Sequence, residues 1–517
     1  MNLGSALKVP LPTETGRGIA DDQSWLAGSM LVMGAAMAQT LRIGLASDPD
    51  TLDPTLSRTS ASFVVRSALC DRLFDIGPEL EIVPQLAIEW RWTEDRKGLV
   101  IKLRPNVKFH DGEPFDAAAL KYNIERHLTM PGSARRSDIR AIAGVEVIDA
   151  HTAKVLLSAP FAPLLAQLAT GAGMMVSPKA ALAAGENFGL HLVCSGPFKF
   201  VERIAQDRIV LERFADYWDT DKIKLERIVY TPIPDSTVRL ANLQSAGLDL
   251  IEFVAPTDVE TVRKDPRLKL AEVNALGYYG LTINVANGAH AKTPLGQDAR
   301  VRQALELSID RDALNQVVFN GEFEPGNQWV APTNPYYIKP LPIPAPDVAK
   351  AKTLLTAAGT PNPVVTLMIT TLSERIQIAE VIQAMAKESG FDIRIQATEF
   401  TSAQQHAADG DFEAFFWGWG GRIDPDGNIS SILGCNAAFN YQHYCNPEVD
   451  RELEAARELD ARAERLAHYR IVAEHILHDL PIIYLYHPKW LYAHTAKLSG
   501  FVPYPDGMIR PQGLRLD

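Results

Sequence analysis

The chain has 517 residues, which is long enough to bury several hydrophobic cores and suggests two to four lobes. Its hydrophobic fraction of 46% and charged fraction of 22% are those of an ordinary globular protein. The formal net charge of −12 argues against a nucleic-acid partner, because phosphate binding favours a basic surface. No apolar run reaches the roughly 18 residues that a membrane-spanning helix needs.

Residues 1–38 have the features of an export leader. Residues 26–38 are small and apolar, and Ala36-Met37-Ala38 fits a signal-peptidase site before Gln39. The segment before them is long and mixed in charge, whereas a secretory n-region is short and basic. We therefore expect a signal peptide with extra residues upstream, cleaved near Ala38, and a periplasmic protein. The alternative is a disordered leader on a cytosolic protein.

The next segments predict a strand, a helix and a hairpin. Thr40–Ala46 alternates polar and apolar residues, as a strand does, and Ser60–Phe74 has helical spacing. Ser60 fits either a helix cap or a polar group presented to a ligand. Further on, Glu89–Thr93 and Leu99–Leu103 flank a charged turn and predict a hairpin, and Asp116 fits the cap of a following helix.

Later segments alternate between strand and helix, which is the pattern of α/β units. The predicted fold class is therefore α/β. The expected elements in this part of the chain are Val365–Ile369, Gln377–Glu388, Asp392–Ala397 and Glu413–Trp417, followed by two helices within Pro447–His478 and a strand at Ile482–Tyr486.

The stretch from Phe415 to Cys445 is the strongest candidate for a binding site. Trp417 and Trp419 lie two apart, so they can share one face of a strand. Gly420 and Gly421 remove side chains where another group must come close to the backbone. Aromatic walls with a few fixed charges are typical of a small-molecule pocket. The alternative is a core strand followed by an exposed acidic turn.

The four cysteines divide into two kinds. Cys435 and Cys445 lie ten positions apart in a polar loop, which suits a local disulfide in an oxidising compartment. Cys70 and Cys194 lie in apolar contexts, and we expect them to be buried thiols.

Several separated motifs resemble family 5 extracellular solute-binding proteins, the receptors of peptide, nickel and opine ABC importers. They are the hairpin with FHDGEPFDA at residues 109–117, CSGPF at 194–198, DYWD at 216–219 and RVRQAL at 300–305. The resemblance covers residues 40–517 and keeps the motifs in order.

The resemblance implies a type II-like periplasmic binding protein with two ligand-clamping lobes, a hinge near Ala275 and Tyr484, and a peripheral third lobe. Lobe I would take residues 40–74, 186–275 and 485–517. Lobe II, the peripheral insertion, would be 75–185, and lobe III would be 276–484. The ligand would lie between lobes I and III, which close around it.

The resemblance also implies a set of ligand-binding residues and supports the Cys435–Cys445 disulfide. The implied ligand-binding residues are Arg58, Thr59, Ser60, Tyr278, Tyr279, Asn284, Trp329, Trp417, Trp419, Gly420, Gly421, Arg422, Asp424 and Asn440.

Arg422 departs from the pattern of the peptide-binding members, which carry an Asp after the Gly-Trp-x-x run to pair with the peptide ammonium. A guanidinium there suggests a ligand with a carboxylate, because the two groups match in parallel hydrogen bonds. The alternative is an internal pair of Arg422 with Asp424 or Asp426 that only shapes the turn.

We expect a receptor and no enzyme, because the P-loop, HExxH and G-x-S-x-G motifs are missing. The expected ligand is a short peptide or a related small polar, acidic solute, and the expected partners are the permease subunits of an ABC transporter. We expect a monomer, no cofactor and no metal site. The alternative function is a secreted hydrolase that uses Asp424 and Asp426.

Overall fold

The computed structural model describes residues 39–517, apart from the side chain of Thr401; the predicted leader 1–38 and its cleavage site at Ala38 lie outside the described residues. Within this range, no helix is both long and apolar enough to cross a bilayer. The helices are α1 Ser60–Leu69, α2 Ala117–Thr129, α3 Leu164–Leu168, α4 Pro178–Ala184, α5 Ser236–Gln244, α6 Val259–Lys264, α7 Pro294–Gln297, α8 Ala299–Leu307, α9 Arg311–Phe319, α10 Val348–Ala357, α11 Ser373–Ser389, α12 Phe400–Asp409, α13 Asp426–Leu433, α14 Pro447–Arg457 and α15 Arg462–Asp479.

A seven-stranded sheet contains β1, the first strand of the described chain, and β19, while the last two strands, β20 Leu498–Ser499 and β21 Arg515–Leu516, pair separately with each other. β1 pairs in parallel with β10 and β11, while β8, β9, β12 and β19 complete the sheet with antiparallel neighbours. Its strands in spatial order are β12 Leu268–Asn274, β19 Lys489–Thr495, β11 Leu250–Ile251, β1 Thr40–Leu45, β10 Arg227–Pro232, β9 Arg208–Arg213 and β8 Phe198–Ile204.

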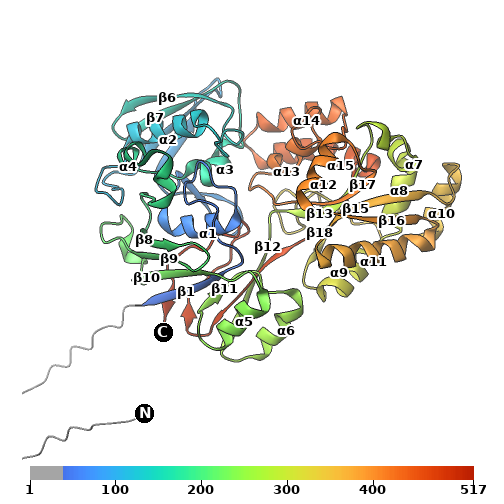
Figure 1. Cartoon of the computed structure of the whole chain (residues 1–517). Helices are drawn as coiled ribbons and strands as arrows, with labels where there is room; N and C mark the ends of the chain where they lie inside the picture. The colour runs from blue at the N-terminus through green and yellow to red at the C-terminus, as the bar shows by residue number, and fades with distance from the viewer. Residues whose placement is uncertain (1–38) are drawn as a thin grey trace, which may run out of the picture. The chain divides into compact units, whose positions relative to one another are not determined.

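A six-stranded sheet is joined to the seven-stranded sheet by two segments of the chain that cross between them (Figure 1). Helices α8 to α11 cover one of its faces, and α12 to α15 cover the other. Its strands in spatial order are β14 Glu324–Pro325, β18 Ile482–His487, β13 Tyr278–Ile283, β17 Ala414–Trp419, β15 Val364–Thr370 and β16 Asp392–Thr398. The mixed α/β architecture and the separate α14 and α15 confirm the predictions.

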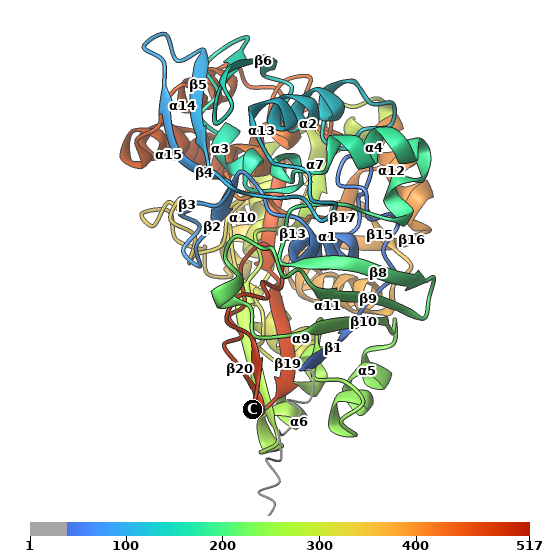
Figure 2. The same cartoon turned by 90° about the vertical axis from the view of Figure 1, so that its left-hand side faces the viewer.

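A four-stranded sheet belongs to residues 75–185 and packs against α2, whose N-cap is Asp116 as predicted. Figure 2 shows α1 between the β8–β10 edge of the large sheet and this smaller part of the protein. Its strands in spatial order are β4 Ala87–Trp92, β5 Gly98–Leu103, β7 Thr152–Leu157 and β6 Ile142–Asp149, and β2 Phe74–Ile76 pairs with β3 Ile82–Pro84 beside it.

The chain crosses between the two large sheets twice, after β12 and after β18. The backbone N–H of Ala275 donates to the carbonyl of Pro488 at 2.9 Å, so the two crossings are hydrogen-bonded to each other. The first crossing includes Ala275, one of the two residues near which the hinge was predicted. The other crossing lies at Pro488, because β18 continues through His487 and Tyr484 is a buried residue inside that strand.

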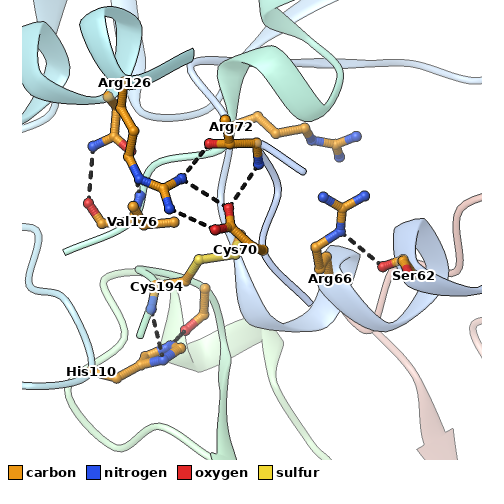
Figure 3. The surroundings of a disulfide bond; sticks show 12 residues. Ser62, Arg66, Cys70, Arg72, His110, Arg126, Val176 and Cys194 are labelled. Carbon is orange, nitrogen blue, oxygen red and sulfur yellow. Dashed lines mark hydrogen bonds and ion pairs between the residues drawn. A yellow bond between two sulfur atoms is a disulfide. The ribbon is translucent and has the colours of Figure 1, made fainter. Parts of the chain in front are cut away.

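The structure contains a disulfide between Cys70 and Cys194, so the prediction of two buried thiols was wrong (Figure 3). Cys70 follows α1 directly, and Cys194 lies on the segment that returns from the four-stranded part. His110 accepts a hydrogen bond from the Cys194 N–H at 3.3 Å through Nδ1, and its Nε2 contacts the Gly196 carbonyl at 3.0 Å. This junction, residues 70–75 with 173–196, is called the neck below.

The predicted disulfide between Cys435 and Cys445 also forms. It closes a loop of the six-stranded part just after α13. Asn440 lies inside this loop, donating to the carbonyls of Gly434 and Tyr444 at 2.9 and 2.6 Å and accepting from the Tyr444 N–H at 3.0 Å. The loop is therefore fixed by its own polar contacts as well as by sulfur.

Candidate functional site

A cavity of about 320 Å³ lies where residues of the three predicted lobes meet. The crossing residue Leu276 is among the residues that line it. The polar and aromatic side chains that line it are Arg58, Ser60, Phe63, Arg135, Asp138, Gln167, Thr170, Glu252, Phe253, Arg422, Trp490 and Asp506.

The Gly420-Gly421-Arg422 segment lines this cavity directly after β17. Gly421 has φ +82°, and a Cβ there would lie 2.3 Å from the backbone carbon of Leu276. Only glycine fits at this position, since both the conformation and the close approach exclude a side chain. A Cβ on Gly420 would have no neighbour within 4 Å, so this residue leaves the cavity open.

Arg422 lines the cavity and has no carboxylate partner among the described residues. Its guanidinium lies over the Trp419 ring at 4.8 Å, and Nη1 donates to the Gly421 carbonyl at 2.8 Å. Its backbone is held by Asn428, which accepts from the Arg422 N–H and donates to its carbonyl. Within the part of the chain that the structure describes, no carboxylate lies within ion-pair distance of Arg422.

The predicted alternative, a pair of Arg422 with Asp424 or Asp426, is wrong. Asp424 forms two hydrogen bonds with Arg465 at 2.6 and 2.7 Å, and Asp426 pairs with Arg457 at 2.8 Å. Asp424 also accepts from the Asp426 N–H at 3.0 Å, the side-chain-to-backbone bond expected of a turn. Both carboxylates are buried and paired, which gives no support to a hydrolase that would use them as acid and base.

Arg135 and Asp138 come from the predicted peripheral lobe, and sequence reasoning missed them. They form an ion pair at 3.1 Å, and Arg135 also donates to the Ser57 carbonyl at 3.1 Å. Burial lowers the pKa of Arg135 and raises that of Asp138, and the charge of Arg422 acts on both pKa values. Arg422 and this pair therefore lie close to one another.

A second missed group lies on the wall formed by the seven-stranded sheet. Glu252 and Phe253 follow β11, and Phe253 packs edge-on against Trp490 with ring centroids 5.1 Å apart. Sequence patterns do not show this group, because Glu252 lies in what looks like a continuous strand over Leu248–Phe253. The strand in fact ends at Ile251.

Most predicted aromatic residues pack inside the six-stranded part and do not line the cavity. Tyr278 lies edge-on against Tyr484 at 4.7 Å, and Tyr279 stacks on Phe416 and Tyr486. Trp329 is 1% exposed, and Trp417 packs against Phe400 and Phe415. Trp419 lies beneath the Arg422 guanidinium, donating Nε1–H to Asn428 at 3.1 Å, so it supports the cavity wall from behind.

The predicted polar residues divide between the cavity and the core. Arg58 and Ser60 line the cavity. The N-cap of α1 is Thr59 and not Ser60, which is the first residue of the helix. Asn284 is fully buried and bonds to backbone carbonyls, including Phe412 at 2.8 Å. Asn284, Asn440 and Asp424 lie outside this cavity and have structural partners.

Two sheets linked by two crossings, with a cavity beside the crossings, are the architecture of type II periplasmic binding proteins. The description "bacterial extracellular solute-binding proteins, family 5 Middle" belongs to the family profile that matches residues 81–440. The chain belongs to this family.

Relatives and solved structures agree with this assignment over nearly the whole length. The glutathione-binding protein GsiB of Pectobacterium atrosepticum is 28% identical over 94% of this chain and 95% of its own. GsiB of Salmonella typhi is 29% identical over 93% of this chain and 95% of its own. The structure of HbpA2 from Haemophilus parasuis is 25% identical, with a TM-score of 0.82 and coverage of 92% of this chain and 100% of its own. The periplasmic binding protein DppA of Helicobacter pylori, solved with the peptide STSA, is 25% identical, with a TM-score of 0.78 and coverage of 92% and 98%.

Proposed function

We propose that this protein is the periplasmic receptor of an ABC importer, exported with a signal peptide that is cleaved near Ala38. It binds a small acidic organic solute of the short-peptide kind in the cavity beside the crossings. The two large sheets then move together around the ligand, and the closed form delivers it to the permease in the inner membrane. Binding supplies the free energy of closure, because the ligand contacts both walls only in the closed form.

One observation supports the proposal of an acidic ligand most directly. Arg422 lines the cavity, while Asp424 and Asp426 are paired with other arginines. A guanidinium without an acid partner in a partly enclosed site favours an anion from outside the chain. The relatives named for glutathione point the same way, since glutathione is a short peptide with two carboxylates. No metal or cofactor enters the proposal.

A binding panel tests the proposal. Purified protein is titrated by calorimetry with glutathione, acidic dipeptides, neutral dipeptides and basic dipeptides of similar size. We expect the acidic members to bind most tightly and to raise the unfolding temperature, because a ligand that binds only the folded state stabilises it. Preference for basic or neutral members would contradict the acidic ligand, and turnover of any member would contradict the receptor function.

A further inference from the structure

Three carboxylates line the cavity, and two of them are already paired. Asp138 pairs with Arg135 at 3.1 Å, and Asp506 pairs with Arg510 at 2.9 Å. Glu252 is the exception: among the described residues, no Lys, Arg or His nitrogen lies within ion-pair distance of its carboxylate. A buried carboxylate without a cation is costly, so its presence in a cavity wall calls for a partner.

The backbone around Glu252 is held in a conformation that places this side chain at the wall. Phe253, the next residue, has φ +52°, a left-handed conformation that bulky residues rarely adopt. Arg239 stabilises the turn by donating to the carbonyls of Ile233, Glu252 and Phe253 at 2.6, 3.3 and 3.0 Å. The guanidinium is thus bonded to carbonyls of this turn.

The Glu252 carboxylate has one fixed contact and one free oxygen. Oε1 accepts from the Ala46 N–H at 2.8 Å, and Oε2 has no hydrogen-bond partner within residues 39–517. Burial raises the pKa of Glu252 to about 7, while the Ala46 bond and the charge of Arg239 oppose the rise. Tyr230 and Tyr492 lie on neighbouring strands, and their pKa values are raised chiefly by burial and further by the charge of Glu252. Both side chains are therefore neutral near pH 7.

The unpaired charged side chains that line the cavity indicate the chemistry of its ligand. Arg58 and Arg422 line it without an acid partner, and Glu252 lines it without a cation partner. We propose that Glu252 binds the ammonium group of a ligand whose two acidic groups are taken by the arginines. The ligand is then an amino dicarboxylate or a short peptide with two carboxylates and one ammonium. Phe253 and Trp490 line the same cavity and pack edge-on against each other, and aromatic rings there would add a favourable contact to an ammonium.

This inference rests on the proposed function and adds the ammonium end of the ligand. It is tested with two pairs of probes that differ only in the amine. Glutathione is compared with glutaryl-cysteinylglycine, and glycylglutamate with acetylglutamate, so that both carboxylates stay in every probe. In the wild-type protein we expect the amine member of a pair to bind at least roughly 30-fold more tightly.

Glu252→Gln keeps the shape of the side chain and removes its charge. We expect it to weaken the amine member by roughly 30-fold or more and to leave the amine-free member within about threefold. The matched control is Glu413→Gln, since Glu413 is also buried and accepts a backbone N–H, from Thr366 at 2.8 Å, but lies outside the cavity. Affinity of the control should equal that of the wild type.

A pH series adds a readout that a structural role would not produce. The amine probes should bind the wild-type protein more tightly as pH rises from 5 to about 7.5, because the ammonium needs the ionised carboxylate. Glu252→Gln should remove this dependence. Equal binding of the two members of each pair, or an unchanged affinity in Glu252→Gln, would overturn the inference and leave an acidic ligand standing. Failure of every acidic probe to bind would contradict the proposed function itself.

Discussion

The two walls of the cavity are built in different ways. The wall at Gly420, Gly421 and Arg422 is one continuous segment that follows a single strand. The rest of the lining combines residues from α1, the four-stranded part, the turn after β11 and the end of the chain, and is called the assembled wall. A continuous wall carries its own sequence signal, whereas an assembled wall depends on long-range contacts that no local pattern reveals.

The same difference separates the two disulfides. Cys435 and Cys445 are 10 residues apart and close one loop near the continuous wall. Cys70 and Cys194 are 124 residues apart, and between them lies the whole four-stranded part, including Arg135 and Asp138 of the assembled wall. The long-range disulfide therefore joins the two chain segments at the base of the part that supplies these residues.

Removing each disulfide should affect the two walls unequally. On the chain-entropy model, the double variant Cys70→Ser/Cys194→Ser should lose about 5 kcal/mol of unfolding free energy, against about 3 kcal/mol for Cys435→Ser/Cys445→Ser. Denaturant unfolding of the oxidised proteins measures both values. The first variant should also bind acidic probes more weakly, because it loosens the base of the part that carries Arg135. Equal losses in both variants would contradict the larger stabilisation expected from the disulfide that closes the longer loop.

Arg422→Ala tests the continuous wall by itself. We expect affinity for the tightest acidic probe to fall by about 2–5 kcal/mol, because a desolvated charge loses its partner. Calorimetry gives the value. Arg300→Ala is the matched control, since Arg300 lies on α8 of the same part, is paired with Asp298 and is outside the cavity. Full affinity in Arg422→Ala would mean that the replacement of the expected Asp has only a structural role.

His110 tests the neck through pH. Burial lowers its pKa from 6.5 to about 4, so the folded state keeps it neutral at pH 5 while the unfolded state protonates it. Stability is therefore lost as pH falls from 6.5 towards 4, by about 2 kcal/mol at pH 5. His110→Gln should reduce by about one the number of protons taken up on unfolding between pH 5 and 6. An unchanged proton uptake in urea unfolding across this range would show that His110 is protonated in the folded protein.

Arg58 should have the smallest effect. Its side chain is exposed, and exposed charges contribute only about 1 kcal/mol or less because water and salt screen them. Arg58→Ala should weaken an acidic probe by no more than this, and the difference should vanish in 1 M salt. A loss as large as that of Arg422→Ala would place the main acidic group of the ligand at the assembled wall.

The sequence predicted the parts of the fold that local patterns encode. The first strand, the Asp116 cap and the hairpin of β4 and β5 follow from periodicity and turn residues. Family resemblance supplied the lobes, whose boundaries remain a prediction. The Cys70–Cys194 disulfide was not predicted, because the apolar contexts of both cysteines fit buried thiols equally well.

The sequence pattern predicted the continuous wall of the candidate site, and the family resemblance added Arg58 and Ser60 of the assembled wall. Gly420, Gly421 and Arg422 stand out because glycines next to a charge after an apolar strand are unusual in a core. Tyr278, Trp329 and Trp417 lie outside this cavity, and sequence patterns cannot separate the two locations because core packing and pocket lining favour the same aromatic residues. Glu252 was missed because nothing local shows that β11 stops at Ile251 and that Phe253 takes a left-handed conformation.

Native mass spectrometry of the protein purified from the periplasm under non-denaturing conditions tests the acidic-ligand proposal most directly. The cavity charges predict one bound small molecule that carries carboxylates and, by the Glu252 inference, one amine. A tightly bound species with no acidic group would contradict the assignment of Arg422 to the ligand.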